Sequence, residues 1–252
     1  MKKQGSLKRN MKLYKKGADE SYTLGVFPTI ELLKNRPEIV KRVVVHSSIE
    51  ENRGYPLIKE LCQKHHITID IHDPTIKKLS PKNNCYAIGV FHVFHDELED
   101  HNHVVLVNPM DMGNMGTIMR TMLGFEVRDL AIVRPACDVF DPKVIRASMG
   151  AIFSLRVKYY ESFEDYHAQF DHEMYPFMLK GAENIHHVKP HGTFSLIFGN
   201  ESSGLPDDYL KYGQSVFIPH SNAIDSLNLS QSLGIGLYHF TSDQFADKKV
   251  LR

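Results

Sequence analysis

VVLVNPMDMGNMGTIMR, residues Val104–Arg120, is the stretch that decides the fold of this chain. Its first four residues form a continuous apolar run, which is typical of a parallel strand buried on both faces. Gly113 and Gly116 let the backbone turn and come close to a ligand, and the following residues predict a helix over Asn114–Leu123. A strand, a glycine turn and a helix in this order predict an open parallel sheet with a ligand site at the carboxyl ends of its strands.

The chain beyond this stretch repeats the alternation of apolar strands and helices. Strands are predicted over Leu130–Val133, Leu155–Lys158, Phe194–Phe198 and Val216–Ile218, and helices over Val144–Met149 and Leu227–Tyr238. Such alternation indicates a parallel sheet that is covered by helices on both faces. We therefore predict a C-terminal parallel-sheet α/β domain over residues 104–252.

The part of the chain before this domain predicts a second, smaller one. Helices are predicted over Phe27–Lys34 and Tyr55–His65, and strands over Arg42–His46, Ile67–Ile71 and Tyr86–Phe91. Their order predicts a small α/β sandwich over residues 21–95. The two domains join near residues 94–103, which are polar and charged and therefore predict a linker or an exposed hairpin.

The composition excludes several classes of protein. Of the 252 residues, 42% are hydrophobic and 24% are charged, as in ordinary globular proteins. No apolar run approaches the roughly 18 residues that a membrane span needs. The N-terminal residues lack the apolar core of a signal peptide, so we expect a soluble, cytoplasmic protein. Three cysteines without Cys-x-x-Cys spacing argue against a disulfide framework and a zinc ribbon.

The charge distribution leaves the role of residues 1–20 open. The formal net charge is zero, yet seven basic residues precede the first acidic one, Asp19. They are Lys2, Lys3, Lys8, Arg9, Lys12, Lys15 and Lys16. This basic arm either lies along the phosphates of a nucleic acid or is a solvated tail, and the sequence favours neither.

Four histidines gather near the joint between the domains: His92, His95, His101 and His103. A metal site needs convergent ligands at regular spacing, and none is present here. We therefore expect a solvated loop and no metal.

Two further segments follow predicted strands. Residues 198–206, FGNESSGLP, bracket the carboxylate of Glu201 with glycines, and residues 218–230, IPHSNAIDSLNLS, contain Ser226, a natural N-cap for the next helix. In the first segment, Asn114 and Arg120 lie six residues apart and are expected to project to roughly similar sides of their helix. Taken singly, each segment is equally compatible with a turn or helix cap that has no further role.

Together, the three segments resemble the three motifs of the SpoU/TrmH branch of the SPOUT RNA methyltransferases. The first resembles Asn-x-Gly-x-x-x-Arg, the second Gly-Asn-Glu-x-x-Gly-Leu, and the third Ile-Pro-Met, five spacers and Ser-Leu-Asn-Val-Ser. Arg146–Ala151 also matches a segment that is common between the first two motifs. The resemblance covers about Val104–Phe240, with two departures: His220 stands where the family usually has Met, and Ser232 where it usually has Ala.

The resemblance implies that the chain methylates a ribose 2′-hydroxyl in RNA, with S-adenosylmethionine as methyl donor. It assigns the central role to Arg120 and surrounds it with Asn114, Glu201, Ser226 and Asn228. It places the cofactor against Leu179, Gly181, Phe198, Gly199, Asn200, Ile218 and Leu227. Because a guanidinium fork matches phosphate oxygens, we expect Arg120 to clamp a phosphate, while Glu201 orients Arg120 or the loop.

The same resemblance implies a C-terminal trefoil knot, an RNA-binding role for the first domain, and a homodimer that forms through the closing helix. Ribosomal RNA is a more common substrate than transfer RNA for enzymes with such a first domain. Two alternatives stay open at this point. One is a catalytically idle RNA-binding or assembly factor on the same fold. The other is an unrelated α/β enzyme, which the missing phosphate-binding glycine pattern disfavours.

Overall fold

The computed structural model describes residues 11–80 and 84–248, which divide into two compact units. The first contains the described residues up to Val93 together with Phe140–Pro142, and the second contains Phe94–Val139 and the described residues from Lys143 onward. Residues 94–103, expected as a linker between domains, are therefore part of the second unit. Half of the predicted basic arm lies outside the described residues, and its contact with phosphates stays a prediction.

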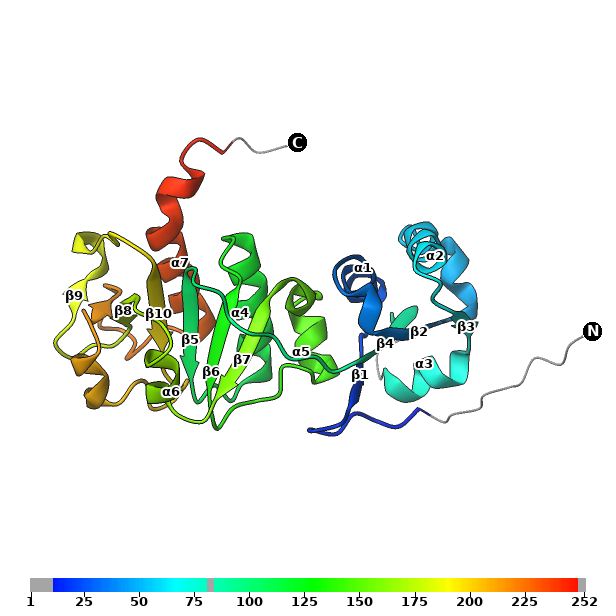
Figure 1. The fold of residues 1–252 in the computed structure, drawn as a ribbon, viewed down its shortest axis with the longest axis horizontal. Coiled ribbons are helices and arrows are strands. Elements are labelled where there is room, and N and C mark those ends of the chain that lie inside the picture. The colour runs from blue at the N-terminus through cyan, green and yellow to red at the C-terminus, as the bar shows by residue number, and fades with distance from the viewer. Residues whose placement is uncertain (1–10, 81–83, 249–252) are drawn as a thin grey trace, which may run out of the picture. The chain divides into compact units, whose positions relative to one another are not determined.

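The second unit is built on a five-stranded parallel sheet, as the sequence predicts (Figure 1). Its strands are β5 (His103–Val107), β6 (Asp129–Val133), β7 (Arg156–Tyr160), β8 (Glu173–Pro176) and β10 (Phe194–Phe198). Their order across the sheet is β7-β6-β5-β10-β8, and every neighbouring pair is parallel. The carboxyl ends of all five strands consequently lie along one edge of the sheet.

Helices follow these strands in the chain. The longer two, α4 (Met112–Gly124) and α7 (Leu229–Phe245), pack against each other (Figure 1). Shorter helices are α5 (Pro142–Ala147), α6 (Phe163–His167) and the 3-10 turns η3 (Ala151–Ser154), η4 (Ile185–His187) and η5 (Asp207–Lys211). A separate two-stranded parallel sheet joins β9 (Glu183–Asn184) and β11 (Val216–Phe217).

Alternate residues of the central strands supply two cores. Val105 and Val107 of β5 join a cluster that contains Phe163 and Tyr166 of α6. The intervening residues of β5 are also fully buried, as are the methionines on the inner side of α4. Burial on both faces explains why this strand reads as an unbroken apolar run.

The first unit is a small mixed sheet with helices on both faces. Its elements are β1 (Glu20–Tyr22), α1 (Val26–Asn35), η1 (Pro37–Ile39), β2 (Val40–Val45), η2 (Ser47–Glu51), α2 (Tyr55–Lys64), β3 (Ile69–Ile71), α3 (Asp73–Leu79) and β4 (Ala87–His92). The strand order is β1-β4-β2-β3, with antiparallel pairs except between β2 and β3. Val43 and Val45 face the core with α1 and α2, whereas Val44 faces the core with α3.

Two details correct the expected architecture. The closing helix begins at Leu229 with Asn228 as its N-cap, so Ser226 does not have the capping role that the sequence suggests. The strand before the third segment, β11, belongs to the small sheet and not to the five-stranded one. The trefoil knot stays a prediction. Among the described residues, no helix is both long and apolar enough to cross a bilayer.

Candidate active site

The first segment forms a turn that is held by its own polar side chains. Asn108 adopts a left-handed conformation with φ of 53°, and its Nδ2 donates to the carbonyl of Arg134 at 2.7 Å. Asp111 is the N-cap of α4, where its carboxylate accepts from the backbone N–H of Asn114 at 2.6 Å. The turn therefore places the start of α4 at the carboxyl end of β5.

Glu201 of the second segment binds this turn through main-chain donors. Its carboxylate accepts from the backbone N–H groups of Met110 at 3.2 Å and of Asp111 at 3.0 Å. The neighbouring Asn200 donates through Nδ2 to the carbonyl of Asn108 at 2.8 Å. Glu201 thus contacts the loop, and no hydrogen bond or ion pair among the described residues joins it to Arg120.

Gly199 allows the second segment to close on itself. A Cβ atom at this position would lie 2.2 Å from the backbone carbon of Gly204, which no side chain could tolerate. The backbone N–H of Gly204 donates to the carbonyl of Asn200 at 2.9 Å and closes the loop. The glycines that bracket this motif are therefore required by close backbone approach.

The third segment reaches the first through two asparagines. Asn228 caps α7 by accepting from the backbone N–H of Ser230 at 2.9 Å, and its Nδ2 donates to Oδ1 of Asn114 at 3.1 Å. Gly116 brings α4 against the end of α5, because a Cβ there would lie 2.3 Å from Cβ of Ala147. Three segments far apart in the sequence are in this way joined at one edge of the sheet.

A cavity of about 480 Å³ opens beside these segments. Six of the seven residues expected to bind the cofactor line it: Leu179, Phe198, Gly199, Asn200, Ile218 and Leu227. The seventh, Gly181, is not part of the lining and sits in a neighbouring turn, where its carbonyl accepts from the Ser215 hydroxyl at 2.9 Å. Glu201 and Ser226, two of the expected catalytic residues, also line the cavity.

The chemistry of the lining fits a ligand that has both a flat apolar part and polar ends. Aromatic and aliphatic side chains, among them Phe177, Phe198 and Ile218, form an apolar wall that suits an adenine ring. The hydroxyls of Ser226 and Ser232 and the carboxylate of Asp225 supply groups that suit a ribose and an amino-acid end. The size and donor set of this cavity thus match S-adenosylmethionine.

Arg120 lies apart from this cavity. Its side chain is exposed, and it has no hydrogen-bond or ion-pair partner within residues 11–80 and 84–248. At about 100° per residue, Arg120 and Asn114 project about 120° apart around α4. The expectation that they share a side of the helix is therefore wrong: Asn114 contacts Asn228, whereas Arg120 is free to bind an external group.

The sequence reasoning missed two polar contributors to this site, Asp111 and Asp225, and named two others, His220 and Ser232, only as departures from the family pattern. Asp111, which caps α4, is signalled by its place three residues before Asn114. His220 and Ser232, which depart from the family pattern, both line the cavity, and Nδ1 of His220 lies 3.0 Å from the carbonyl of Ser221. Asp225 also lines the cavity, and its place in a loop gave no signal.

Comparison with known proteins decides the family. The model of the SpoU rRNA Methylase family matches residues 101–238, more than half of the chain. The chain belongs to the SpoU rRNA Methylase family. It is therefore an RNA 2′-O-ribose methyltransferase that uses S-adenosylmethionine as its methyl donor. The SpoU match spans all three segments of the candidate site.

Curated relatives differ in how much of this chain they match. The 23S rRNA (guanosine(2553)-2′-O)-methyltransferase RlmP of Bacillus subtilis is 24% identical over 213 residues, 83% of either chain. The tRNA (cytidine-2′-O-)-methyltransferase TrmJ of Methanocaldococcus jannaschii is 26% identical over 161 residues, 58% of this chain and 69% of its own. The ribosomal RNA small subunit methyltransferase G 2 of Syntrophobacter fumaroxidans is 30% identical over 134 residues; the match spans 53% of this chain but only 26% of that relative.

Solved structures share the SpoU fold. The methyltransferase AviRb from Streptomyces viridochromogenes, solved in complex with AdoMet, superposes with a TM-score of 0.77 at 22% identity, over 90% of this chain and 91% of its own. A structure described as giving insights into the 2-OH methylation of C/U34 on tRNA superposes with a TM-score of 0.53 at 24% identity. That match covers 59% of this chain and 99% of the other. The first likeness includes both units of the present fold, and the second is no longer than the catalytic unit.

Proposed function

We propose that this enzyme methylates ribosomal RNA. The observation that supports the proposal is the share of this chain that aligns with each relative. The relative named for 23S rRNA aligns over 83% of this chain, which is too much for the second unit alone, whereas the tRNA-named relative aligns over 58%. The structure concerned with tRNA is matched almost whole by 59% of this chain. The first unit therefore accompanies the rRNA-directed relative, which supports an rRNA substrate for this chain.

The reaction needs a positioned ribose and removal of the proton from its 2′-hydroxyl. When bound, the cofactor supplies a methyl group that its sulfonium charge has already activated. Arg120 holds the phosphate next to the target ribose, because its exposed guanidinium has no partner among the described residues and its rigid fork matches phosphate oxygens. A guanidinium delocalises its charge and holds its proton too tightly to act as a base at neutral pH. We therefore assign Arg120 to binding and polarisation and not to proton removal.

The remaining residues position the ribose and shape the site. The bonded pair Asn114 and Asn228 presents amide groups at the junction of α4 and α7. The Ser226 hydroxyl lines the cavity and can hydrogen-bond the ribose. Glu201 contributes indirectly, because its carboxylate fixes the turn from which α4 and Arg120 start.

We also propose that the active form is a homodimer that pairs through α7. Ile235 and Tyr238 of this helix are exposed although they are apolar or largely so, with 40% and 67% of their surface accessible. Arg120 does not line the cavity of its own chain, and a second copy would provide a nearby cavity for it to face. Sedimentation at micromolar concentration is expected to give twice 28.9 kDa. A fully active monomer would overturn this part of the proposal.

The substrate is tested by incubating the enzyme and labelled S-adenosylmethionine with rRNA and tRNA from a strain that lacks the gene. Label should enter rRNA at one nucleotide, and mapping of 2′-O-methyl groups should show that nucleotide unmodified in the deletion strain. Label that enters tRNA alone would replace the rRNA assignment with a tRNA one and would leave the methyltransferase assignment intact.

The role of the first unit is tested with a shortened chain that starts at Phe94. We expect it to bind the cofactor as the full chain does but to bind RNA at least tenfold more weakly, because the first unit carries part of the phosphate contacts. A second chain that starts at Val104 removes Glu99 and Asn102, whose contacts hold the catalytic unit together, and should be less stable. Undiminished RNA affinity of the Phe94 chain would contradict the role of the first unit.

A further inference from the structure

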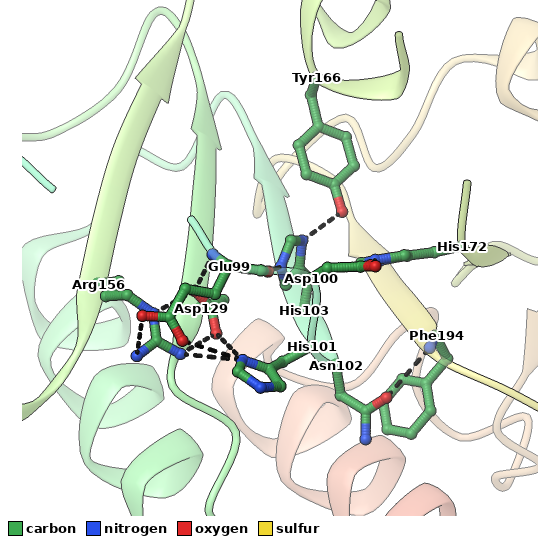
Figure 2. Close-up of polar contacts among 10 residues, drawn as sticks. All are labelled: Glu99, Asp100, His101, Asn102, His103, Asp129, Arg156, Tyr166, His172 and Phe194. Atoms are coloured by element: carbon green, nitrogen blue, oxygen red, sulfur yellow. Dashed lines mark hydrogen bonds and ion pairs between the residues drawn. The ribbon is translucent and has the colours of Figure 1, made fainter. Parts of the chain in front are cut away.

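A buried polar cluster lies at the amino ends of the five parallel strands, away from the cofactor cavity. Figure 2 shows that it joins residues of β5, β6, β7 and β10 to the segment Glu99–Asn102. Four of its side chains are completely buried: His103 of β5, Asp129 of β6, Tyr166 of α6 and Ser195 of β10. The proposed reaction uses none of them, so their presence needs another explanation.

Five hydrogen bonds form one chain through the cluster, and Figure 2 shows one of them, between His103 and Tyr166. Nε2 of His103 lies 2.7 Å from the carbonyl of Glu99, and its Nδ1 lies 2.8 Å from the hydroxyl of Tyr166. That hydroxyl lies 2.6 Å from the hydroxyl of Ser195, which in turn lies 2.8 Å from Nδ1 of His172. The chain ends where Nε2 of His172 meets the Asp100 carboxylate at 2.9 Å. We call these five bonds the relay.

The ends of the relay fix two of its protons. A carbonyl oxygen and an ionised carboxylate can only accept, so Nε2 of His103 and Nε2 of His172 must both carry hydrogen. Three bonds remain between the two Nδ1 atoms, with the hydroxyls of Tyr166 and Ser195 between them. Each hydroxyl has one proton to donate, which serves two of these three bonds. A complete relay therefore needs one further proton, and one of the two imidazoles must carry it as an imidazolium.

The surroundings select which imidazole carries this proton. Burial lowers the pKa of His103 to about 4; the bond to the Glu99 carbonyl and the charges of Asp129 and Asp100 oppose that effect, while His172 adds to it. His103 is therefore neutral near pH 7. His172 is the other candidate, and its Nε2 lies against the Asp100 carboxylate, whose side chain is 86% exposed. The exposed carboxylate also gives the buried relay a route for exchange of the proton with water.

We propose that His172 carries the fifth proton of the relay and acts as a pH-sensitive clamp on the segment Glu99–Asn102. With the proton in place, the bonds run in one direction: His172 donates to Ser195, Ser195 to Tyr166, and Tyr166 to His103. Without it, one of these three buried bonds has no hydrogen, and the Asp100 carboxylate faces a neutral ring. The clamp therefore holds while His172 carries this proton and weakens when the proton is lost.

The other charged groups around the segment are paired among themselves and do not replace the clamp. Arg156 of β7 binds the Asp129 carboxylate through two nitrogens, at 2.6 and 2.5 Å, and lies 3.4 Å from the Glu99 carboxylate. His101 lies near the carboxylates of Glu99 and Asp129, at 3.4 and 3.9 Å. The backbone N–H of Glu99 donates to Asp129 at 3.0 Å. Loss of the His172 proton would thus release Asp100 and its neighbours while the Asp129 pair persists.

The segment lies in the chain between Val93, where the first unit ends, and β5, and this position is the basis for the function that we assign to the clamp. If the first unit binds RNA, as proposed above, order in this segment affects the RNA-dependent step and leaves cofactor binding unchanged. The clamp itself is defined by contacts inside the catalytic unit alone. Its test is therefore independent of the substrate.

The direct test is NMR of the full chain labelled with [15N]histidine, with His172 assigned by its absence in His172→Gln. Both ring nitrogens of His172 should remain protonated at a pH at which the same histidine in the denatured chain has lost one proton. The folded chain should bind that proton at least tenfold more tightly. The matched control is His187→Gln, which removes an exposed histidine that also meets a carboxylate, Glu183 at 2.9 Å, outside the relay. A His172 ring that is neutral in the folded chain at pH 6 would overturn the proposal.

Hydrogen exchange of the peptide that contains Glu99–His103 tests the clamp itself. After correction for the intrinsic effect of pH, exchange in the wild type should increase at least fivefold as His172 loses its proton. Asp100→Asn and Ser195→Ala should raise exchange already at low pH, and His187→Gln should behave as the wild type. Asp100→Asn keeps the shape of an exposed side chain, so it tests the charge without risk to folding. An exchange rate in the wild type that does not depend on the charge of His172 would refute the clamp.

Discussion

Polar side chains at the two ends of the parallel sheet differ in whether they have hydrogen-bond partners within the chain. At the carboxyl ends, the hydroxyls of Ser226 and Ser232 and the guanidinium of Arg120 have no hydrogen-bond partner among the described residues. At the amino ends, His103 and Asp129 are fully buried and every polar atom of the relay is bonded. One end keeps donors and acceptors for a ligand, whereas the other uses them within the chain.

Within this one unit, residues that serve the reaction are therefore distinct from residues that stabilise the fold. Polar groups that have no partner until a substrate binds contribute little to folding. Their removal should therefore impair the reaction and leave the stability of the fold unchanged. Groups that satisfy one another inside the protein should show the reverse, because removal of one leaves its partner buried and unpaired. Each prediction below tests on which side of this division a residue falls.

The largest effect is expected at the carboxyl end. Arg120→Ala should lower kcat at least a hundredfold, since a positioned charge that acts on a developing anion contributes on this scale. The melting temperature and the cofactor Kd should stay unchanged, because Arg120 has no partner among the described residues. Arg120→Lys should fail nearly as badly, as a point charge does not reproduce the fork.

The control for Arg120 is Arg128→Ala, which removes an exposed arginine just before β6, at the other end of the sheet. It should turn over as the wild type does. Near-normal turnover of Arg120→Ala would contradict both the assigned role and the comparison of the two ends.

Asp129→Ala should produce the largest loss of stability at the amino end. Asp129 is fully buried and pairs with Arg156, whose side chain is 24% exposed. Breaking such a pair costs about 3 kcal/mol, the lower end of the range for buried pairs, because Arg156 retains some contact with water. Denaturant unfolding measures the loss, and kcat per folded molecule should be retained. A variant that stays stable but loses activity would reverse the assignment.

His103 predicts a loss of stability in acid. Its pKa is about 4 in the folded chain and near 6.5 when unfolded, so above pH 6.5 both states are neutral and its contribution is fully present. As the pH falls from 6.5 to 4, His103 takes up a proton in the unfolded chain but stays neutral in the folded chain. The free energy of unfolding therefore falls by about 3 kcal/mol. The slope of unfolding free energy against pH checks this, with the NMR titration of His103 in denaturant as reference. A His103 ring that protonates near pH 6.5 in the folded chain would contradict it.

The sequence alone predicts much of the sheet because its strands are apolar on both faces. The strand over Phe194–Phe198 is confirmed residue for residue, and the apolar runs at Val104 and Leu130 lie within β5 and β6. The helix predicted over Asn114–Leu123 is three residues too short, since Asp111 caps it so that it begins two residues earlier, and it ends one residue later. Buried parallel strands are easy to read because no polar residue interrupts them.

The segment around His101 and His103 shows that burial cannot be predicted from neighbouring residues in the sequence alone. It is polar, so it predicts a solvated loop, yet His103 starts β5 and is completely buried. Its burial depends on partners such as Tyr166 and Ser195, which lie 63 and 92 residues away. In the same way, Asn228 and not Ser226 caps α7 because Asn114 holds it from another element. Such long-range pairs carry no local signal.

The smallest effect is expected on α7, which connects the cavity to the proposed dimer surface. At Gly234, a Cβ would make only an ordinary contact with Cγ2 of Thr121 at 3.7 Å, so Gly234→Ala should stabilise the chain by up to about 1 kcal/mol through helix propensity. At Gly236, a Cβ would lie 2.9 Å from Cζ of the half-buried Phe177 ring, so Gly236→Ala should destabilise the chain. Unfolding measures both effects, and sedimentation of the same samples should show that the Gly234→Ala protein remains a dimer. If Gly234→Ala instead destabilised the chain and produced monomers, a partner backbone would have to lie directly against Gly234. The exposed surface of α7 would then be a packed interface, and not a surface on which a substitution has little effect.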